Sequence, residues 1–319
     1  MTFHNRKRTL AAKIETTPGT AESLSGSDGA FNIFNADIIP DIPQEIREAA
    51  GSLDYLASLP GGYKGSANFR VYCEWDGTAT EPLWADTFLP ACGYVKSTNT
   101  FNPLTEAPGS NVKTLTIGLW REPYFLSLAG AMGSAKINFL AGRPVFIDFA
   151  FQGVWQAVVD DDPPSITYPN TTKARYGGAT GAAVYDSVNM CLASAVVDLG
   201  NEIYVRECPS TDAGYIAAHI VDRRPIITVD PESVAEATQA RWAKLLDSSE
   251  AELSFVAKGA AGTSSDATFG VTMPKAQIVK NTLAERGKIA TDAIEFQANK
   301  NGSTNDRALA INFVPKVDS

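Results

Sequence analysis

The sequence has little of the chemistry that most hydrolases and transferases use. Only two histidines occur, His4 and His219, and His4 lies in a polar, basic N-terminal segment. A Ser-His-Asp or Cys-His arrangement needs a histidine beside its nucleophile, so almost no material for nucleophilic catalysis is present. No Gly-x-x-x-x-Gly-Lys-Ser/Thr or Gly-x-Gly-x-x-Gly motif opens a predicted helix either. The sequence therefore predicts a protein that is not an enzyme.

Cysteine is also scarce. The four cysteines, Cys73, Cys92, Cys191 and Cys208, form no Cys-x-x-Cys pair, and so few histidines cannot complete a zinc site. Three aspartates at residues 160–162 precede two prolines and lack further spaced ligands, so we expect a solvated loop rather than a calcium site. Apolar neighbours predict that the cysteines are buried thiols in a reducing compartment. Neither a metal nor a cofactor is expected.

Long apolar runs and an excess of basic charge are both missing. No apolar run reaches the roughly 18 residues of a membrane span, and no apolar signal core follows the basic N-terminal residues. We therefore expect no membrane association and a chain that assembles from the cytosol. The net charge of −9 argues against a general grip on nucleic acid, which needs clustered Lys and Arg. It does not exclude a surface past which DNA slides.

An internal repeat is what the sequence does have. Residues 31–46 align without a gap with residues 188–203, which lie 157 positions further along. Most aligned positions exchange one apolar residue for another. Five are identical: Asn32/Asn189, Ala36/Ala193, Asp41/Asp198, Glu45/Glu202 and Ile46/Ile203. Repeats of this kind fix architecture before any site chemistry is considered.

The predicted elements that follow each copy come in the same order. Each copy continues with a strand, a helix that contains a tryptophan, and a group of strands that closes on Phe-Gln. These features are at residues 67–75, Trp84 and Gln152 in copy one, and at residues 225–229, Trp242 and Gln297 in copy two. In copy two, Ser233 and Glu236 form a capping box before an apolar stripe of Trp242, Leu245 and Leu246.

We therefore expect a mainly β protein with two tandem β-sandwich or barrel domains, each with one flanking α-helix, related by internal duplication. The expected boundaries are an extended N-terminal arm (1–30), copy one (31–160), a linker (161–186) and copy two (187–319). Pro40 and Pro43 remove ladder donors, which predicts that the first strand of copy one lies at a sheet edge or carries a bulge.

Three segments of copy one resemble a known family. Residues 8–20 read Arg-Thr-Leu-Ala-Ala-Lys-Ile-Glu-Thr-Thr-Pro-Gly-Thr, and residues 130–153 carry glycines and aromatics spaced as in a characteristic pair of strands. Residues 114–120 fit between them. Together they resemble the tail tube proteins (major tail proteins) of long-tailed, non-contractile bacteriophages. Copy two matches this family only through copy one.

The resemblance implies a virion structural protein. In that family six β domains close a ring whose inner face is a continuous barrel, and the rings stack into a tube through which DNA passes without specific binding. A chain with two copies would form the ring as a trimer with pseudo-sixfold symmetry, with a hexamer as the alternative. Other tail proteins would bind the tube ends. The expected location is the virion tail, and the host cytoplasm during assembly.

Two sets of residues are candidates for roles in such a tube. The N-terminal arm and the loop at residues 96–110 are expected to contact the next ring. The candidates are Thr9, Leu10, Lys13, Ile14, Glu15, Thr100 and Phe101. An acidic lumen would repel DNA rather than hold it. The lumen-facing candidates are Gln44, Glu45, Asn201 and Glu202.

Two other functions stay open. One is another ring-forming component, such as a tail terminator or the tube of a contractile injection system, although these are generally single-domain proteins. The other is a carbohydrate-binding or adhesin-type β protein. That function predicts exposed aromatics on a concave face and often calcium ligands, and neither is evident in the sequence.

Overall fold

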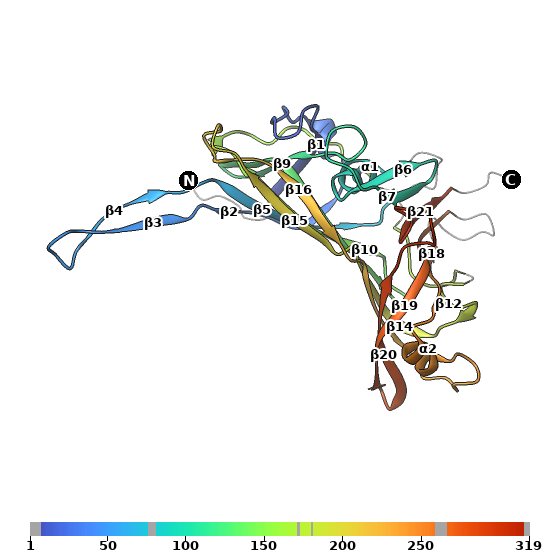
Figure 1. Cartoon of the computed structure of the whole chain (residues 1–319). Helices are drawn as coiled ribbons and strands as arrows, with labels where there is room; N and C mark the ends of the chain where they lie inside the picture. The colour runs from blue at the N-terminus through green and yellow to red at the C-terminus, as the bar shows by residue number, and fades with distance from the viewer. Residues whose placement is uncertain (1–7, 76–80, 171–172, 180, 259–266, 316–319) are drawn as a thin grey trace.

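The chain is mainly β, as the sequence predicts. The structure is a computed structural model that describes residues 8–75, 81–170, 173–179, 181–258 and 267–315. Within these residues strands dominate, and α-helix is confined to two short segments (Figure 1).

The described residues of the first half of the chain contribute eleven strands, one 3-10 helix and one α-helix. They are β1 (Arg8–Ile14), η1 (Gly26–Gly29), β2 (Ile33–Asp41), β3 (Gln44–Glu48), β4 (Tyr55–Pro60), β5 (Lys64–Tyr72), α1 (Leu83–Ala91), β6 (Tyr94–Ser97), β7 (Thr100–Pro103), β8 (Leu115–Arg121), β9 (Tyr124–Leu140), β10 (Phe146–Trp155) and β11 (Val159–Asp160).

The second half contributes ten strands and one α-helix among the described residues. They are β12 (Ala183–Tyr185), β13 (Val188–Asn189), β14 (Leu192–Asp198), β15 (Asn201–Glu207), β16 (Tyr215–Arg223), β17 (Ile226–Pro231), α2 (Arg241–Asp247), β18 (Glu250–Lys258), β19 (Thr268–Arg286), β20 (Ile289–Ala298) and β21 (Ala310–Val314).

Eight of these strands form one continuous antiparallel sheet. Its order is β2, β5, β10, β9, β14, β17, β20 and β19. The first four strands come from the first half and the last four from the second, so the same succession of pairings occurs twice. A closed barrel, one of the two expected architectures, is not formed by the described residues of a single chain, because β2 and β19 lie at opposite ends of the sheet.

One hydrophobic core runs through both halves. In it Phe139 of β9 stacks on Phe255 and Phe269 of the second half, with ring centroids 5.5 and 6.1 Å apart. The C-terminal strand β21 returns to the first half and pairs with β7, where Ile311 lies opposite Phe101. The halves are therefore joined by a shared sheet and shared packing.

Local sequence explains several elements. In β5 the buried positions alternate with more exposed ones, as expected for a strand with one face on the core. Helix α1 begins after Pro82, buries Trp84 and Phe88, and ends before Gly93, whose φ of +74° suits glycine. Strand β2 contains Pro40 and pairs only with β5 among the described strands, which confirms the predicted edge position.

Two assignments made from local sequence pattern differ from the structure: the start of the second helix, and the division of the strands before the first Phe-Gln pair. No capping box forms at Ser233, because its hydroxyl donates to Asp292 Oδ1 (2.9 Å) and α2 begins only at Arg241. Within the predicted group of strands before the first Phe-Gln pair, residues 124–140 form one long strand, β9, which passes through Gly130 at a φ of +60°.

The N-terminal segment also differs from the expected extended arm. Residues 8–14 form β1, which pairs with β8 in register from Arg8 opposite Arg121 to Ile14 opposite Leu115. The apolar run Leu10, Ala11 and Ala12 is buried, and this burial holds the segment in the fold. Residues 1–7 of the expected arm lie outside the described residues.

Candidate assembly surfaces

The predicted inter-ring residues fall into two groups. The side chains of Leu10, Glu15 and Phe101 are buried within the chain, so they pack inside the protein rather than on its surface. Thr9, Lys13, Ile14 and Thr100 are half-buried. Two of these already have partners: Lys13 pairs with Glu22 (3.4 Å), and Thr100 Oγ1 donates to Asn312 Oδ1 (3.1 Å).

Glu15 fixes the segment after β1 to the sheet. Its carboxylate accepts hydrogen bonds from the hydroxyls of Thr114 (2.7 Å) and Thr116 (2.9 Å) and from the backbone N–H groups of Gly19 (2.8 Å) and Gly130 (2.7 Å). Four donors satisfy a carboxylate that is only 2% exposed. Its role is to hold the N-terminal segment in place.

The predicted lumen residues lie at the starts of two hairpins. Gln44 and Glu45 are exposed on β3, and Glu202 is exposed on β15. Asn201 is half-buried, and its side-chain amide donates to the carbonyls of Cys92 (2.8 Å) and Gly133 (2.9 Å). Asn201 therefore fastens β15 to the first half of the chain.

A polar face of the eight-stranded sheet holds an open depression of about 730 Å³. Its charged lining includes two cross-strand ion pairs, Arg70 with Asp148 (2.7 Å) and Lys136 with Asp198 (3.0 Å). Because each cation faces a carboxylate, this part of the face has no excess of positive charge with which to bind phosphates.

The strand registers of the two halves can be compared row by row. In each half a buried residue of the first strand (β2 or β14) faces one on the next strand (β5 or β17), which in turn faces the Phe of a Phe-Gln pair. The two rows are Ile38, Ala67 and Phe151, and Val197, Ile227 and Phe296. Ile38 is therefore equivalent to Val197. The gapless sequence alignment is shifted by two residues relative to this register. A shift of two leaves each residue on the same face of its strand, because side chains alternate between the two faces.

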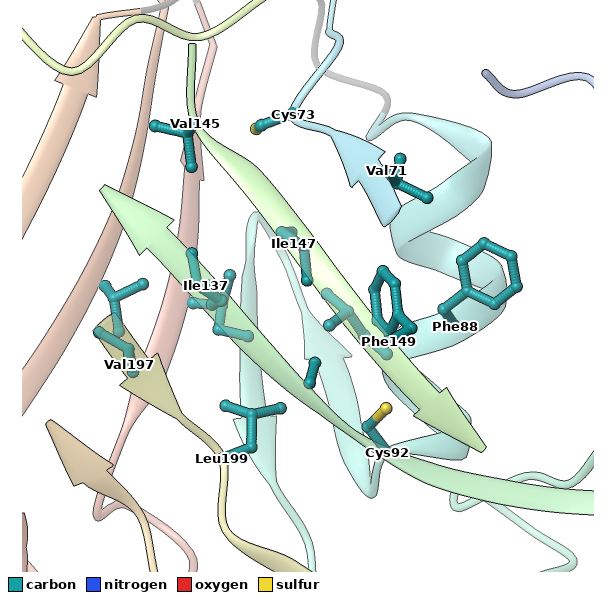
Figure 2. Packing of buried hydrophobic residues seen from close by; sticks show 14 of the residues in the cluster. Val71, Cys73, Phe88, Cys92, Ile137, Val145, Ile147, Phe149, Val197 and Leu199 are labelled. Atoms are coloured by element: carbon teal, nitrogen blue, oxygen red, sulfur yellow. The ribbon is translucent and has the colours of Figure 1, made fainter. Parts of the chain in front are cut away.

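The same registers relate β9 to β19. Ile137 faces Ile147, and Leu283 faces Asp292. Both facing residues lie four positions before the Phe of the Phe-Gln pair, so Ile137 and Leu283 are equivalent. Ile137 is fully buried, because β14 covers this edge of β9 with Val197 opposite it (Figure 2). Leu283 is 77% exposed.

Both ends of the eight-stranded sheet are thus open along their backbones. Among the described strands, β2 pairs only with β5, and β19 beyond Gln277 pairs only with β20. Two arginine side chains reach β2: Arg8 Nη1 donates to Ala36 O (2.7 Å), and Arg121 lies 3.8 Å from Asp37. An open strand edge is a template for pairing with another chain.

Two hairpins extend β2–β5 and β14–β17, and their surroundings differ. The β15–β16 hairpin packs on the first half, where Val205 and Ala218 join Val112, Met132 and Val154 in a second apolar cluster. The β3–β4 hairpin extends away from the body (Figure 1) and is exposed at every position of both strands. Sequence reasoning missed both hairpins. The turn residues Gly51, Ser52 and Asp54 were the available signal.

Metal binding finds no support in the described part of the chain, where no group of three or more His, Cys, Asp or Glu could hold an ion. None of the described helices is long and apolar enough to cross a membrane. No protein-family model matches the sequence, and no curated protein matches it either.

Proposed function

We propose that this chain is a structural protein that assembles with itself into stacked rings, forming the tail tube of a bacteriophage. The tube is a conduit for DNA ejection. In this proposal the two halves arose by internal duplication, and three chains form a ring with pseudo-sixfold symmetry. The protein is placed in the virion tail, and in the host cytoplasm before assembly.

The observation that carries this proposal is the pair of complementary sheet ends. Within the chain, β14 of the second half pairs with residues 136–140 of β9 in the first half. The equivalents of these partners, β2 and the end of β19, lie at opposite ends of the same sheet, and each pairs with one described strand only. A head-to-tail contact between β19 of one chain and β2 of the next would repeat the internal junction. Repeated contacts of this type close a ring when the rotation allows it.

The internal junction also specifies the register of the proposed contact. Val197 lies opposite Ile137, and Asp198 lies opposite Lys136. Transferred to the equivalent residues, these pairs place Ile38 of one chain opposite Leu283 of another, and Ile39 opposite Thr282. Leu283 would then gain the apolar cover that Ile137 already has, which stabilises the contact by about 1.5–3 kcal/mol if burial is complete.

The charge pattern of the polar face is compatible with a DNA conduit. Ion pairs such as Arg70 with Asp148 neutralise its cations, and the whole chain carries a net charge of −9. A lumen lined by such a surface would repel phosphates rather than retain them.

The direct test is electron microscopy of the purified full-length protein combined with native mass spectrometry. The proposal expects tubes with a central channel and rings that contain three chains. Rings of six chains would be consistent with a tube but would contradict the proposed ring of three chains. A monomer at every concentration, especially one that binds glycans, would contradict the proposed function and favour an adhesin-type protein.

A further inference from the structure

The β3–β4 hairpin is an exposed arm with an apolar surface. Its large apolar side chains are exposed on both faces: Ile46 71%, Leu53 100%, Tyr55 69%, Leu56 47% and Leu59 49%. Two-stranded hairpins without a packed face have little stability in water. A hairpin of this composition is expected to be covered by another surface.

The equivalent hairpin in the second half has such a cover. One face of β15–β16 carries Val205 and Ala218, which pack on Met132 of β9 and Val154 of β10. Its polar anchors are equally definite: Arg223 Nη2 donates to Gly93 O (3.2 Å), and Asn201 donates to Gly133 O (2.9 Å). The β15–β16 hairpin therefore lies across β9 and β10 of the first half.

The tip of the β15–β16 hairpin reaches the base of the β3–β4 hairpin. The carbonyl of Ala213 accepts a hydrogen bond from the N–H of Tyr63 (2.9 Å), and Lys64 Nζ lies 5.8 Å from the ring centroid of Tyr215. Both sides of this contact have an equivalent in the other half. The tip of β15–β16 corresponds to the tip of β3–β4 at residues 49–54, and the base of β3–β4 corresponds to the base of β15–β16 around Asp222 and Arg223.

We propose that the β3–β4 hairpin docks across β19 and β20 of a second copy of this chain, with its tip at the base of that copy's β15–β16 hairpin. This contact between chains would repeat the one that the β15–β16 hairpin makes with β9 and β10 within a single chain. It rests on the proposed ring, because the β19 end of one chain must meet the β2 end of another for the hairpin to reach.

Charge complementarity supports this partner. The hairpin and its turn carry three carboxylates, Glu45, Glu48 and Asp54, against one arginine, Arg47. The receiving face carries three cations, Arg224 at the base of β15–β16 and Lys275 and Lys280 on β19. It also carries two carboxylates, Asp222 at the hairpin base and Glu295 opposite Lys280, so cations are in the majority there. Among the described residues none of these three cations forms an ion pair within 4.0 Å, although Arg224 Nε donates to Gln297 Oε1 (2.9 Å).

Disulfide trapping tests the contact in the full-length chain. Leu53→Cys and Asp222→Cys are combined in a background of Cys191→Ser and Cys208→Ser, which removes the two accessible native thiols. Docking holds the new thiols at high effective concentration, so cross-linked dimers and trimers should exceed those of either single variant by about tenfold or more. The matched control is Tyr63→Cys with Ala213→Cys, which should link within one chain and leave its mass unchanged on a denaturing gel.

The outcomes separate the hairpin contact from the proposed function. Cross-linked trimers, together with rings seen by electron microscopy, support both the hairpin contact and the proposed ring. Rings or tubes that form normally without cross-linked chains would overturn the hairpin contact and leave the ring standing. A wild-type chain that never associates would overturn both.

Discussion

Ile137 and Leu283 occupy equivalent positions in the two halves of the sheet, yet Ile137 is fully buried and Leu283 is 77% exposed. β14 pairs along the edge of β9, whereas β19 beyond Gln277 pairs only with β20 among the described strands. In the proposed ring, this edge of β19 is where a second copy attaches, and Leu283 is covered there.

Leu283→Asp should weaken association without destabilising the monomer. The substitution removes about 1.5–3 kcal/mol of apolar burial from each contact, which corresponds to roughly 10- to 100-fold weaker association. Sedimentation velocity measures the association. The free energy of unfolding should stay within about 0.5 kcal/mol of wild type, because the site is exposed in the single chain. Leu246→Asp on α2, where the leucine is 86% exposed, is the matched control. Equal association by all three proteins would remove β19 from the interface.

Ile137→Ala should destabilise the monomer itself, in contrast to Leu283→Asp. Because Ile137 is fully buried within the chain, its truncation leaves a cavity and should lower the free energy of unfolding by about 2–5 kcal/mol. Chemical denaturation of the monomer provides the measurement. A loss below 1 kcal/mol would show that the junction of β9 with β14 is loosely packed, and the equivalence with Leu283 would lose its basis.

The proposed register can be tested by a second pair of cysteines. Ile39→Cys and Thr282→Cys, in the background lacking Cys191 and Cys208, should form a disulfide between chains. The equivalent residues within one chain, Asp198 and Lys136, lie directly opposite each other on paired strands. Ile39→Cys with Ala284→Cys, two positions out of register, is the control. Efficient linkage by the control pair and not by the first would mean that the strands meet in a different register.

Much of the fold could be predicted from the sequence. The strand predicted at residues 67–75 overlaps β5, and Pro40 and Pro43 predicted the edge position of β2, because proline removes a backbone donor from the ladder. The helix at Ser233 could not be predicted correctly. Its capping pattern was present, but the tertiary hydrogen bond from Ser233 to Asp292 replaced it.

The candidate site was less predictable. Leu10 and Phe101 were expected at the surface, but their burial depends on strands that are distant in sequence, β8 and β21. The exposure of Leu283 could not be predicted from the sequence either, because only the strand registers show that Leu283 corresponds to Ile137. A sequence pattern gives the faces of a strand but not which of its edges is covered.

Glu15 should contribute to stability through its four hydrogen bonds. Glu15→Gln replaces one oxygen with a donor, so one backbone N–H, of Gly19 or Gly130, loses its acceptor. A buried unsatisfied donor costs about 1–3 kcal/mol, and the free energy of unfolding should fall by that amount. Glu202→Gln, at an exposed carboxylate, is the control and should change it by less than about 0.5 kcal/mol. Identical unfolding of both variants would show that Glu15 does not hold the N-terminal segment.

The four cysteines are free, and they should differ sharply in reactivity. They were expected to be buried, but Cys191 is exposed and Cys208 is partly exposed. Burial raises the pKa of the Cys73 and Cys92 thiols, whereas hydrogen bonds from Ser210 lower the pKa of Cys208. A lower pKa means more thiolate at neutral pH. Alkylation followed by mass spectrometry should therefore modify Cys208 first.

Cys191 should follow Cys208, because partial desolvation and Glu232 raise its pKa. Cys73 and Cys92 should react only after unfolding. Rapid labelling of Cys92 in the native protein would contradict the packing of α1 against the sheet.

Cryo-electron microscopy of the assembled full-length protein tests the central claim most directly. The account predicts three chains per ring, with β2 of one chain paired to β19 of the next and Ile38 opposite Leu283. A ring of six chains, or a ring in which these two edges face solvent, would contradict it.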